Sequence, residues 1–536
     1  MDKEFDLIIS GGTVYDGLGN SGQQADVAVS GDKICRIGLG LDKKKAKVVI
    51  EATDLVVSPG FIDPHSHTDI ELLVNPRAES KIRQGVTTEI SGNCGFTMFP
   101  LTAANIEEKK RYTQEKYGLD LDWVDIGGFF NRLEEKGMAL NYATLLGHGS
   151  IRSAVFGHQD RPPTEREMSD MKRLVRENME AGALGLSTGL IYSPSCFAQQ
   201  SEIIELCREV AAYGGLYTTH MRNEGDLLIE AVEEAIQTAW AARISLQISH
   251  LKLAYPRNWP KLHMVLSRIS EVKAQGMEIM ADRYPYTATS TLLNTFIPKW
   301  IQQGTTDEYL SRLKDPALDG KIREFVKIQE EKIASWDNVF ISSVLTADNQ
   351  HLIGKSIGEA AVEMRKEPYE LIRDLLIDER DQVWMINFSL SEDNFKRIIA
   401  HPLVVIGSDG WALAPYGTLG RDKPHPRSYG TFTRMLGRYV RDENLMPLGT
   451  AIEKMTSLAA RKFGLTGRGV IKEGFFADIV VFDPSNIIDL ADWTEPHRYG
   501  RGISYVIVNG DIVIREGEHT GATPGRILKK INHINI

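Results

Sequence analysis

The chain has few cysteines, no long apolar run and no excess of positive charge. Its four cysteines, Cys35, Cys94, Cys196 and Cys207, follow no paired spacing, so a reducing compartment fits better than a disulfide framework. No stretch approaches the roughly 20 apolar residues that a membrane-spanning helix needs. The amino terminus, MDKEFDLIISGG, has no signal-peptide pattern. These absences predict a soluble, cytoplasmic protein with no membrane partner.

The charge balance excludes another class of partner. The 536 residues carry a formal net charge of −10, and no dense basic patch offsets it, so we expect no nucleic-acid partner. A hydrophobic content of 42% is enough for a large buried core, and this length predicts about two to four domains. Whether the chain is a monomer or a homo-oligomer is left open by its sequence.

Both ends of the chain have the pattern of β-strands. Short β-type runs alternate with Gly/Asp turns over 5–60, which is typical of a small antiparallel sheet, and 477–483 and 503–510 have the same pattern. Each part alone is too small to bury one face of a sheet. We therefore expect a discontinuous β-sandwich domain made of 1–60 and 466–536, the second part ending in a tail.

The middle of the chain, 61–465, repeats a short apolar strand, a polar turn and an amphipathic helix such as 166–181. The strand candidates are 61–67, 85–92, 141–148, 183–189, 215–220, 245–250, 277–284 and 402–409. Because parallel strands need helical crossovers, the alternation predicts an α/β fold with a (β/α)8 TIM barrel. The segments 339–344 and 383–388 also have a strand pattern, so the sequence alone does not fix the count.

Potential metal ligands stand at the carboxyl ends of the predicted strands, where barrels of this kind carry their active sites. The segment 59–69, PGFIDPHSHTD, ends an apolar run in a His-x-His pair. Residues two apart in a strand point to the same face, so His65 and His67 can bring both imidazoles to one point. Other strand ends hold Cys94, His220, His250 and Asp409. Together they predict a metal site, and a thiolate with imidazoles favours zinc.

Two further histidines, His148 and His158, also lie near strand ends. Nothing in their spacing demands a ligand role, and we interpret them as structural or supporting residues.

Short motifs along nearly the whole chain resemble a known family. The segment 61–67, the SDG at 408–410 and the flanking β segments resemble the amidohydrolase superfamily. Within it, further motifs resemble the D-aminoacylase (N-acyl-D-amino-acid deacylase) family. They are GNCG at 92–95, GLIY at 189–192, THMRNE at 219–224, SHLK at 249–252, YPY at 284–286, HPR at 425–427 and HTGATPGR at 519–526.

The resemblance implies two metal positions. One tightly bound zinc ion would be held by Cys94, His220 and His250. A second, weaker position would use His65, His67 and Asp409. Many amidohydrolases bridge two metals with a carboxylated lysine on the fourth strand, whereas this family uses the cysteine. The segment 183–189 contains no lysine, which agrees with that departure.

The implied reaction is hydrolysis of the amide bond of an N-acyl-D-amino acid, which yields a carboxylate and the free D-amino acid. A metal-activated hydroxide would attack, and Asp409 would act as general base and then general acid. The substrate's α-carboxylate favours a bidentate arginine. By resemblance this is Arg427, and the further pocket residues are Tyr284, Ser290, Lys252 and Tyr192. The preference for D over L comes from the resemblance alone.

An insertion and two alternative functions stay open. The segment 291–345 is longer than a barrel loop needs, and it is interpreted either as a lid over the site or as a surface elaboration.

The first alternative function is that of a cyclic-amide hydrolase of the hydantoinase or dihydroorotase kind, against which the missing lysine and the GNCG motif argue. The second is a non-enzymatic member that keeps the barrel as an assembly module. It would be expected to lose metal ligands, and all six are present.

Overall fold

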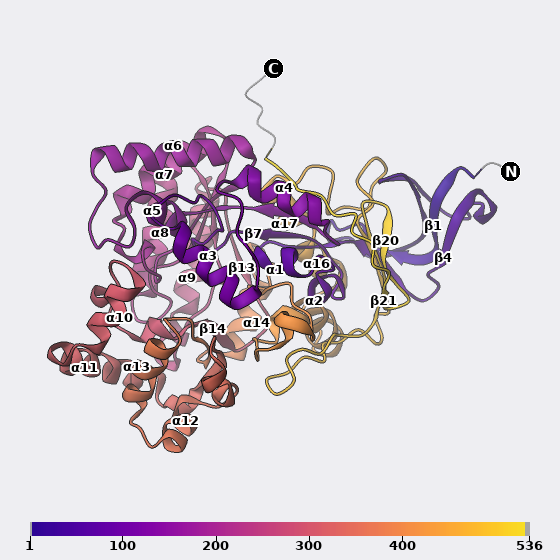
Figure 1. Cartoon of the computed structure of the whole chain (residues 1–536). Helices are drawn as coiled ribbons and strands as arrows, with labels where there is room; N and C mark the ends of the chain where they lie inside the picture. The colour runs from indigo at the N-terminus through magenta and orange to yellow at the C-terminus, as the bar shows by residue number, and fades with distance from the viewer. Residues whose placement is uncertain (1–2, 531–536) are drawn as a thin grey trace.

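Eight parallel strand positions form a barrel at the centre of the protein (Figure 1). The computed structural model describes residues 3–530. The barrel strands are β6 (Phe61–Asp63), β7 (Val86–Ser91), β8 (Asn141–Thr144) with its continuation β9 (Leu146–Gly147), β10 (Gly185–Gly189), β11 (Leu216–His220), β12 (Ser245–Ile248), β13 (Ile279–Arg283) and β17 (Val404–Ile406). Neighbours pair in parallel from β6 to β8 and from β9 to β17. Each predicted strand range contains one barrel position, so the predicted (β/α)8 fold is confirmed.

Helices connect successive strands and cover the outside of the barrel (Figure 1). Those before β17 are α1 (Ile70–Val74), α2 (Glu79–Ile82), α3 (Ile106–Tyr117), α4 (Ile126–Lys136), α5 (His148–Phe156), α6 (Glu165–Ala181), α7 (Gln200–Ala212), α8 (Leu228–Ala242), α9 (Leu262–Ala274) and α14 (Glu392–Ala400). Those after it are α15 (Arg427–Arg434), α16 (Leu448–Met455) and α17 (Ser457–Phe463). Among the described helices, none combines the length and the apolar character of a membrane span.

Local sequence explains these helices, and α6 is an example. Thr164 and Glu167 form a capping box that satisfies free backbone N–H groups at its start. Gly182 ends the helix in the left-handed conformation, with φ of 117°, that glycine adopts without strain. Met171, Leu174 and other residues three or four apart are buried, as expected for one apolar stripe facing the barrel.

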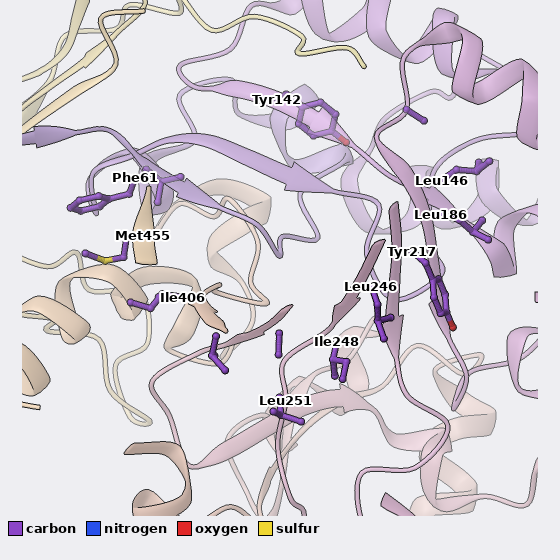
Figure 2. Packing of buried hydrophobic residues seen from close by; sticks show 14 of the residues in the cluster. Phe61, Tyr142, Leu146, Leu186, Tyr217, Leu246, Ile248, Leu251, Ile406 and Met455 are labelled. Atoms are coloured by element: carbon purple, nitrogen blue, oxygen red, sulfur yellow. The ribbon is translucent and has the colours of Figure 1, made fainter. Parts of the chain in front are cut away.

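The largest hydrophobic core packs side chains of neighbouring strands against the surrounding helices. Figure 2 shows Leu186, Tyr217 and Leu246, which come from the consecutive strands β10, β11 and β12, packed in one cluster. Each is at most 1% exposed. Phe61 on β6 stacks on Phe432 with ring centroids 5.8 Å apart. Burial of this kind contributes roughly 25 cal/mol per Å² of apolar surface, and it fixes the strands whose ends carry the predicted ligands.

The two chain ends form one nine-stranded sheet beside the barrel (Figure 1). Its strands are β1 (Phe5–Val14), β2 (Gln23–Ser30), β3 (Lys33–Gly38), β4 (Ala46–Glu51), β5 (Val56–Pro59), β18 (Ile479–Phe482), β19 (Ile503–Val508), β20 (Asp511–Arg515) and β21 (Glu518–His519). The ends are joined by antiparallel pairing of β5 with β18. The expectation of a purely antiparallel sheet is wrong, because β1 pairs in parallel with both β4 and β5.

The tail that follows this sheet returns to the barrel. Pro524 and Ile527 pair with Met138 and Tyr142 at the start of β8. The last residues of the predicted tail, 531–536, lie outside the described residues.

A separate unit is inserted between β13 and β17. It contains an antiparallel sheet of β14 (Ala288–Leu292), β15 (Val339–Ser343) and β16 (Trp384–Phe388). Its helices are α10 (Thr306–Lys314), α11 (Pro316–Ile333), α12 (Ile357–Met364) and α13 (Pro368–Asp378). A hydrophobic core of its own extends from Leu293 to Met385. The insertion therefore continues past residue 345, because the strand-like segment 383–388 pairs with β14 and with the segment 339–344, and neither segment is a barrel strand.

Candidate metal centre

Six side chains from five strand ends converge at the carboxyl end of the barrel. His65 and His67 follow β6, Cys94 follows β7, His220 ends β11, His250 follows β12 and Asp409 follows β17. Their donor atoms form two overlapping sets, and within each set all atoms lie within 4.8 Å of one another. One set is His65, His67, Cys94 and Asp409, and the other is Cys94, His220 and His250. The structure thus brings together every ligand that the sequence predicts, with the cysteine common to both sets.

The sulfur of Cys94 lies at the centre of this cluster. Its Sγ is 3.5 Å from Nε2 of His65, 3.8 Å from Nδ1 of His220 and 3.4 Å from Nε2 of His250. Burial alone would raise the pKa of the Cys94 thiol, but the neighbouring imidazoles of His65 and His250 outweigh burial and hold that pKa well below its usual value. The lowered pKa favours the thiolate, the form that binds metals.

The donor set fits zinc. With Zn–S of about 2.3 Å, Zn–N of about 2.05 Å and a tetrahedral angle, two ligand atoms are about 3.5 Å apart, which is close to the distances around Cys94. Thiolate and imidazole are also the donors that zinc prefers. Five of the six residues are buried and His67 is partly exposed, so most of the donors have little access to water as an alternative partner.

Three of the six residues have an unusual backbone conformation. Cys94 and Asp409 have φ of 53°, and His250 has φ of 37°. This left-handed region disfavours residues with a side chain. Such strain persists only where the surrounding structure enforces it, and it gathers at functional sites.

Two carboxylates orient the histidines, and the sequence analysis missed both of them. Asp282 at the end of β13 places Oδ1 3.0 Å from Nδ1 of His65 and accepts the backbone N–H of His250 at 2.7 Å. Glu224 places Oε1 3.0 Å from Nδ1 of His250. Such carboxylates fix the ring orientation and the tautomer of metal-binding histidines. Asp282 could have been found as a charged residue at the end of an apolar strand, and Glu224 as the final residue of THMRNE.

A cavity of about 710 Å³ opens beside the cluster, and the five predicted substrate-binding residues line it. The Tyr192 hydroxyl bonds to Thr291 of the insertion at 2.7 Å. Lys252 is less available than expected, because its Nζ lies 2.6 Å from both Oε1 of Glu224 and Nδ1 of His250. It therefore holds the Glu224 carboxylate beside His250.

Arg427 lies between Asp409 of the cluster and the ring of Tyr284. Its Nη1 is 2.7 Å from Oδ2 of Asp409, and its guanidinium lies 4.8 Å from the centre of the Tyr284 ring. Ser290 contributes its backbone oxygen, 3.5 Å from Nη2. The Tyr284 hydroxyl has no hydrogen-bond partner among the described residues, so it can bind a ligand. The structure thus groups Arg427, Tyr284 and Ser290 as predicted, with Asp409 as an additional partner.

The same pairing controls the charge of Asp409. Burial raises its pKa, but the Arg427 guanidinium, with smaller effects of His250 and His65, outweighs burial and holds the pKa well below its usual value. The carboxylate is therefore ionised near neutral pH. Its Oδ1 is 2.9 Å from Nε2 of His67, so it lies beside the other donors.

The other two histidines have different surroundings. His148 is buried outside the cavity lining, and its two ring nitrogens lie 2.9 Å from Ser195 Oγ and 2.9 Å from Glu202 Oε1. This Ser-His-Glu arrangement has no access from the cavity, so it links β9 to the loop after β10. His158 lines the cavity, with Nδ1 3.1 Å from Ser193 Oγ.

Comparison with known proteins identifies the family. The model of the Amidohydrolase family matches residues 48–514. The chain belongs to the amidohydrolase family. Over 535 residues it is 36% identical to a D-aminoacylase from Alcaligenes xylosoxydans xylosoxydans, covering 98% of both chains. An N-acyl-D-glutamate deacylase from the same organism is 34% identical, covering 99% of this chain and 98% of the relative.

Solved amidohydrolase structures agree with this assignment. An N-acyl-D-glutamate deacylase from Bordetella bronchiseptica, complexed with zinc and a phosphonate mimic of the tetrahedral intermediate, has a TM-score of 0.83 at 32% identity, covering 98% of this chain and 100% of that one. A D-aminoacylase structure has a TM-score of 0.82 at 35% identity, with the same coverage. A dihydropyrimidinase from Brevibacillus agri, at 16% identity and a TM-score of 0.57, shares the fold.

We expect Cys94→Ser to weaken zinc binding by about 100-fold or more, because loss of even a supporting residue typically costs 10–100-fold and this change removes the donor common to both sets. Zinc affinity can be measured by competition with a chelator. Cys207→Ser is the matched control, because Cys207 is also buried but lies on α7 outside the cavity lining. Equal zinc affinity of the two variants would contradict the assignment of Cys94.

Proposed function

We propose that this chain hydrolyses the amide bond of N-acyl-D-amino acids and releases a carboxylate and a free D-amino acid. The observation that carries the proposal is the buried Cys94–histidine cluster, which lies beside the ionised Asp409 in a cavity that also presents Arg427. Membership of the amidohydrolase family and full-length similarity to D-aminoacylase and the D-glutamate and D-aspartate deacylases support it.

In this proposal the cofactor is zinc. The tighter position is formed by Cys94, His220 and His250, and the weaker one by His65, His67 and Asp409. Bound zinc supplies a Lewis acid that polarises a carbonyl oxygen and lowers the pKa of water toward about 7.

Asp409 moves the proton of the reaction. Its carboxylate is ionised and accepts a proton from the attacking water on one of its oxygens. It then donates that proton to the nitrogen of the leaving amine as the C–N bond breaks. His67, 2.9 Å from Oδ1 of Asp409, and Arg427, 2.7 Å from Oδ2, hold the carboxylate in place.

Arg427 binds the α-carboxylate of the substrate. Its planar guanidinium suits a carboxylate, and the free hydroxyl of Tyr284 can donate a further hydrogen bond to that group. Because Arg427 already contacts Asp409, it serves two anions. It orients the substrate, and it also keeps the general base ionised.

The insertion between β13 and β17 acts as the lid of the site. Its residues Thr291, Phe296 and Trp384 line the cavity, and Trp384 packs edge-on against Trp411 with ring centroids 5.0 Å apart. A cover of this kind excludes water and contacts the substrate side chain. In this organisation 61–465 is the catalytic domain, and 1–60 with 466–536 is the β domain.

The zinc-loaded chain should release amine from N-acetyl-D-amino acids and leave the L-enantiomers and a hydantoin unchanged. Amine release from paired D and L substrates measures this directly. Turnover of the hydantoin alone would instead support a cyclic-amide hydrolase on the same fold.

Asp409→Asn should lower kcat by roughly 10²–10⁴-fold, the usual contribution of general acid–base catalysis, because an amide cannot accept the proton. Zinc held by Cys94, His220 and His250 should be retained. Asp226→Asn is the control, since Asp226 also lines the cavity but pairs with Arg257. A near-normal kcat for Asp409→Asn would remove this residue from the chemistry.

Arg427→Met should raise KM by about 10–150-fold, because a hydrogen bond to a charged group contributes roughly 1.5–3 kcal/mol. It should also raise the pKa of Asp409. As the pH falls, Asp409 should then become protonated, and activity should be lost, at a higher pH than in the wild type. The KM for an N-acyl-D-amino acid amide, which lacks the carboxylate, should change little. Arg222→Met is the control, because Arg222 lines the cavity but pairs with Glu234.

A further inference from the structure

The barrel closes at a seam between its first and last strands that is weaker in backbone pairing than the others. β6 and β17 belong to different sheets. They are joined beyond their ends by a parallel bridge between Ser66 and Gly410, and Asp409 N–H donates to the carbonyl of His65 at 2.8 Å. Because His65 and His67 lie on one side of this seam and Asp409 on the other, the seam sets the spacing of these donors.

One buried ammonium group connects the two sides of the seam. Lys81 on α2 is fully buried, and its Nζ donates to Asp63 Oδ2 at 2.6 Å and to Ser408 Oγ at 2.7 Å. A third, longer bond reaches the carbonyl of Gly410 at 3.3 Å. Asp63 is the last residue of β6, whereas Ser408 and Gly410 flank Asp409.

Asp63 completes the connection. Its Oδ1 accepts the backbone N–H of Ser408 at 2.9 Å, and its Oδ2 accepts the Ser408 hydroxyl at 2.5 Å. The buried Glu89 on β7 lies 3.7 Å from Nζ of Lys81 and accepts the hydroxyl of Ser66 at 2.8 Å. The network therefore holds Ser66, between His65 and His67, on one side of the seam and Ser408, before Asp409, on the other side.

No other side chain could easily replace the lysine. An ammonium offers three donors on a long flexible chain, and here each donor has an acceptor. Removing it would leave the carboxylate of Asp63 buried without its counter-charge, which is strongly unfavourable. Lys81, Asp63 and Ser408 do not line the cavity, so any effect on the reaction acts through the residues they hold.

We propose that Lys81 is a positioning residue of the metal centre, which fixes the Asp409 carboxylate relative to His65 and His67. The proposal rests on the proposed function for its kinetic consequence. Its consequence for zinc binding depends only on the donor geometry.

The test compares Lys81→Met with Lys454→Met. Lys454 is a matched control, because it is also buried and bonds to the carbonyls of His401 and Val404 at the opposite end of β17. Lys81→Met should lower kcat by about 10–100-fold, the usual effect of losing a residue that supports metal ligands, with KM within about 3-fold. Lys454→Met should lower the unfolding midpoint in urea and keep kcat.

Chelator competition provides a readout that needs no turnover. In Lys81→Met, zinc bound at His65, His67 and Asp409 should be released at about 10–100-fold lower chelator concentration. Zinc bound at Cys94, His220 and His250 should be released as in the wild type. If the wild-type chain turns over no N-acyl-D-amino acid, the proposed function fails while this comparison still tests Lys81.

Two results would overturn the proposal. One is a folded Lys81→Met protein with wild-type kcat and zinc affinity, and the other is an equal loss in Lys81→Met and Lys454→Met. If Lys81→Met does not fold, Ser408→Ala replaces it, because this change removes one hydroxyl and leaves Lys81 paired with Asp63. We expect kcat of Ser408→Ala to fall by about 3–10-fold, a smaller share of the same effect, and an unchanged kcat would refute the positioning role.

Discussion

The structure depends on how charged side chains are stabilised at the carboxyl end of the barrel. A thiolate, four imidazoles and a carboxylate converge at one point, and buried charges of this density are stable only when each has a counter-charge or a hydrogen-bond partner. Three ion pairs lie around the cluster, namely Arg427 with Asp409, Lys252 with Glu224 and Lys81 with Asp63. Each pair connects a metal-donor residue, or a residue that holds one in place, to another part of the fold. The same ion pairs therefore stabilise the charges of the cluster and help to close the barrel.

The barrel and the convergence of six donors could be predicted from the sequence, because both follow from short-range rules. Strand and helix periods are visible in the letters, and parallel strands bring their carboxyl ends to one face. The partners of these donors were not visible. Lys81 lies in the segment AESKIRQG, which gives no sign that its ammonium is buried, and Lys252 and Arg427 were expected to face the substrate alone. Pairing among charged side chains depends on tertiary contacts that no local pattern encodes.

The length of the insertion was also missed, for a related physical reason. The strand β16 lies more than 90 residues after β14 in the chain, yet it is the middle strand of their sheet. Pairing at that separation leaves no periodic signal, and the segment could equally have been a barrel strand. Because the insertion has its own hydrophobic core, the roof of the cavity is built apart from the barrel that carries the donors. Side chains in the roof can therefore change while the donor cluster stays the same.

The strained backbone at Cys94, His250 and Asp409 has a consequence for the order of assembly. A residue with a side chain rarely adopts the left-handed conformation in an unfolded chain, and these three residues belong to three strands that are far apart in sequence. Their donor atoms therefore meet only after β7, β12 and β17 have come together. A metal position made of Cys94, His220 and His250 needs only β7, β11 and β12, whereas a position made of His65, His67 and Asp409 needs β6 and β17 to meet. An ion at the second position would therefore add its binding free energy to the closed barrel alone, and so would stabilise the join between the first and last strands.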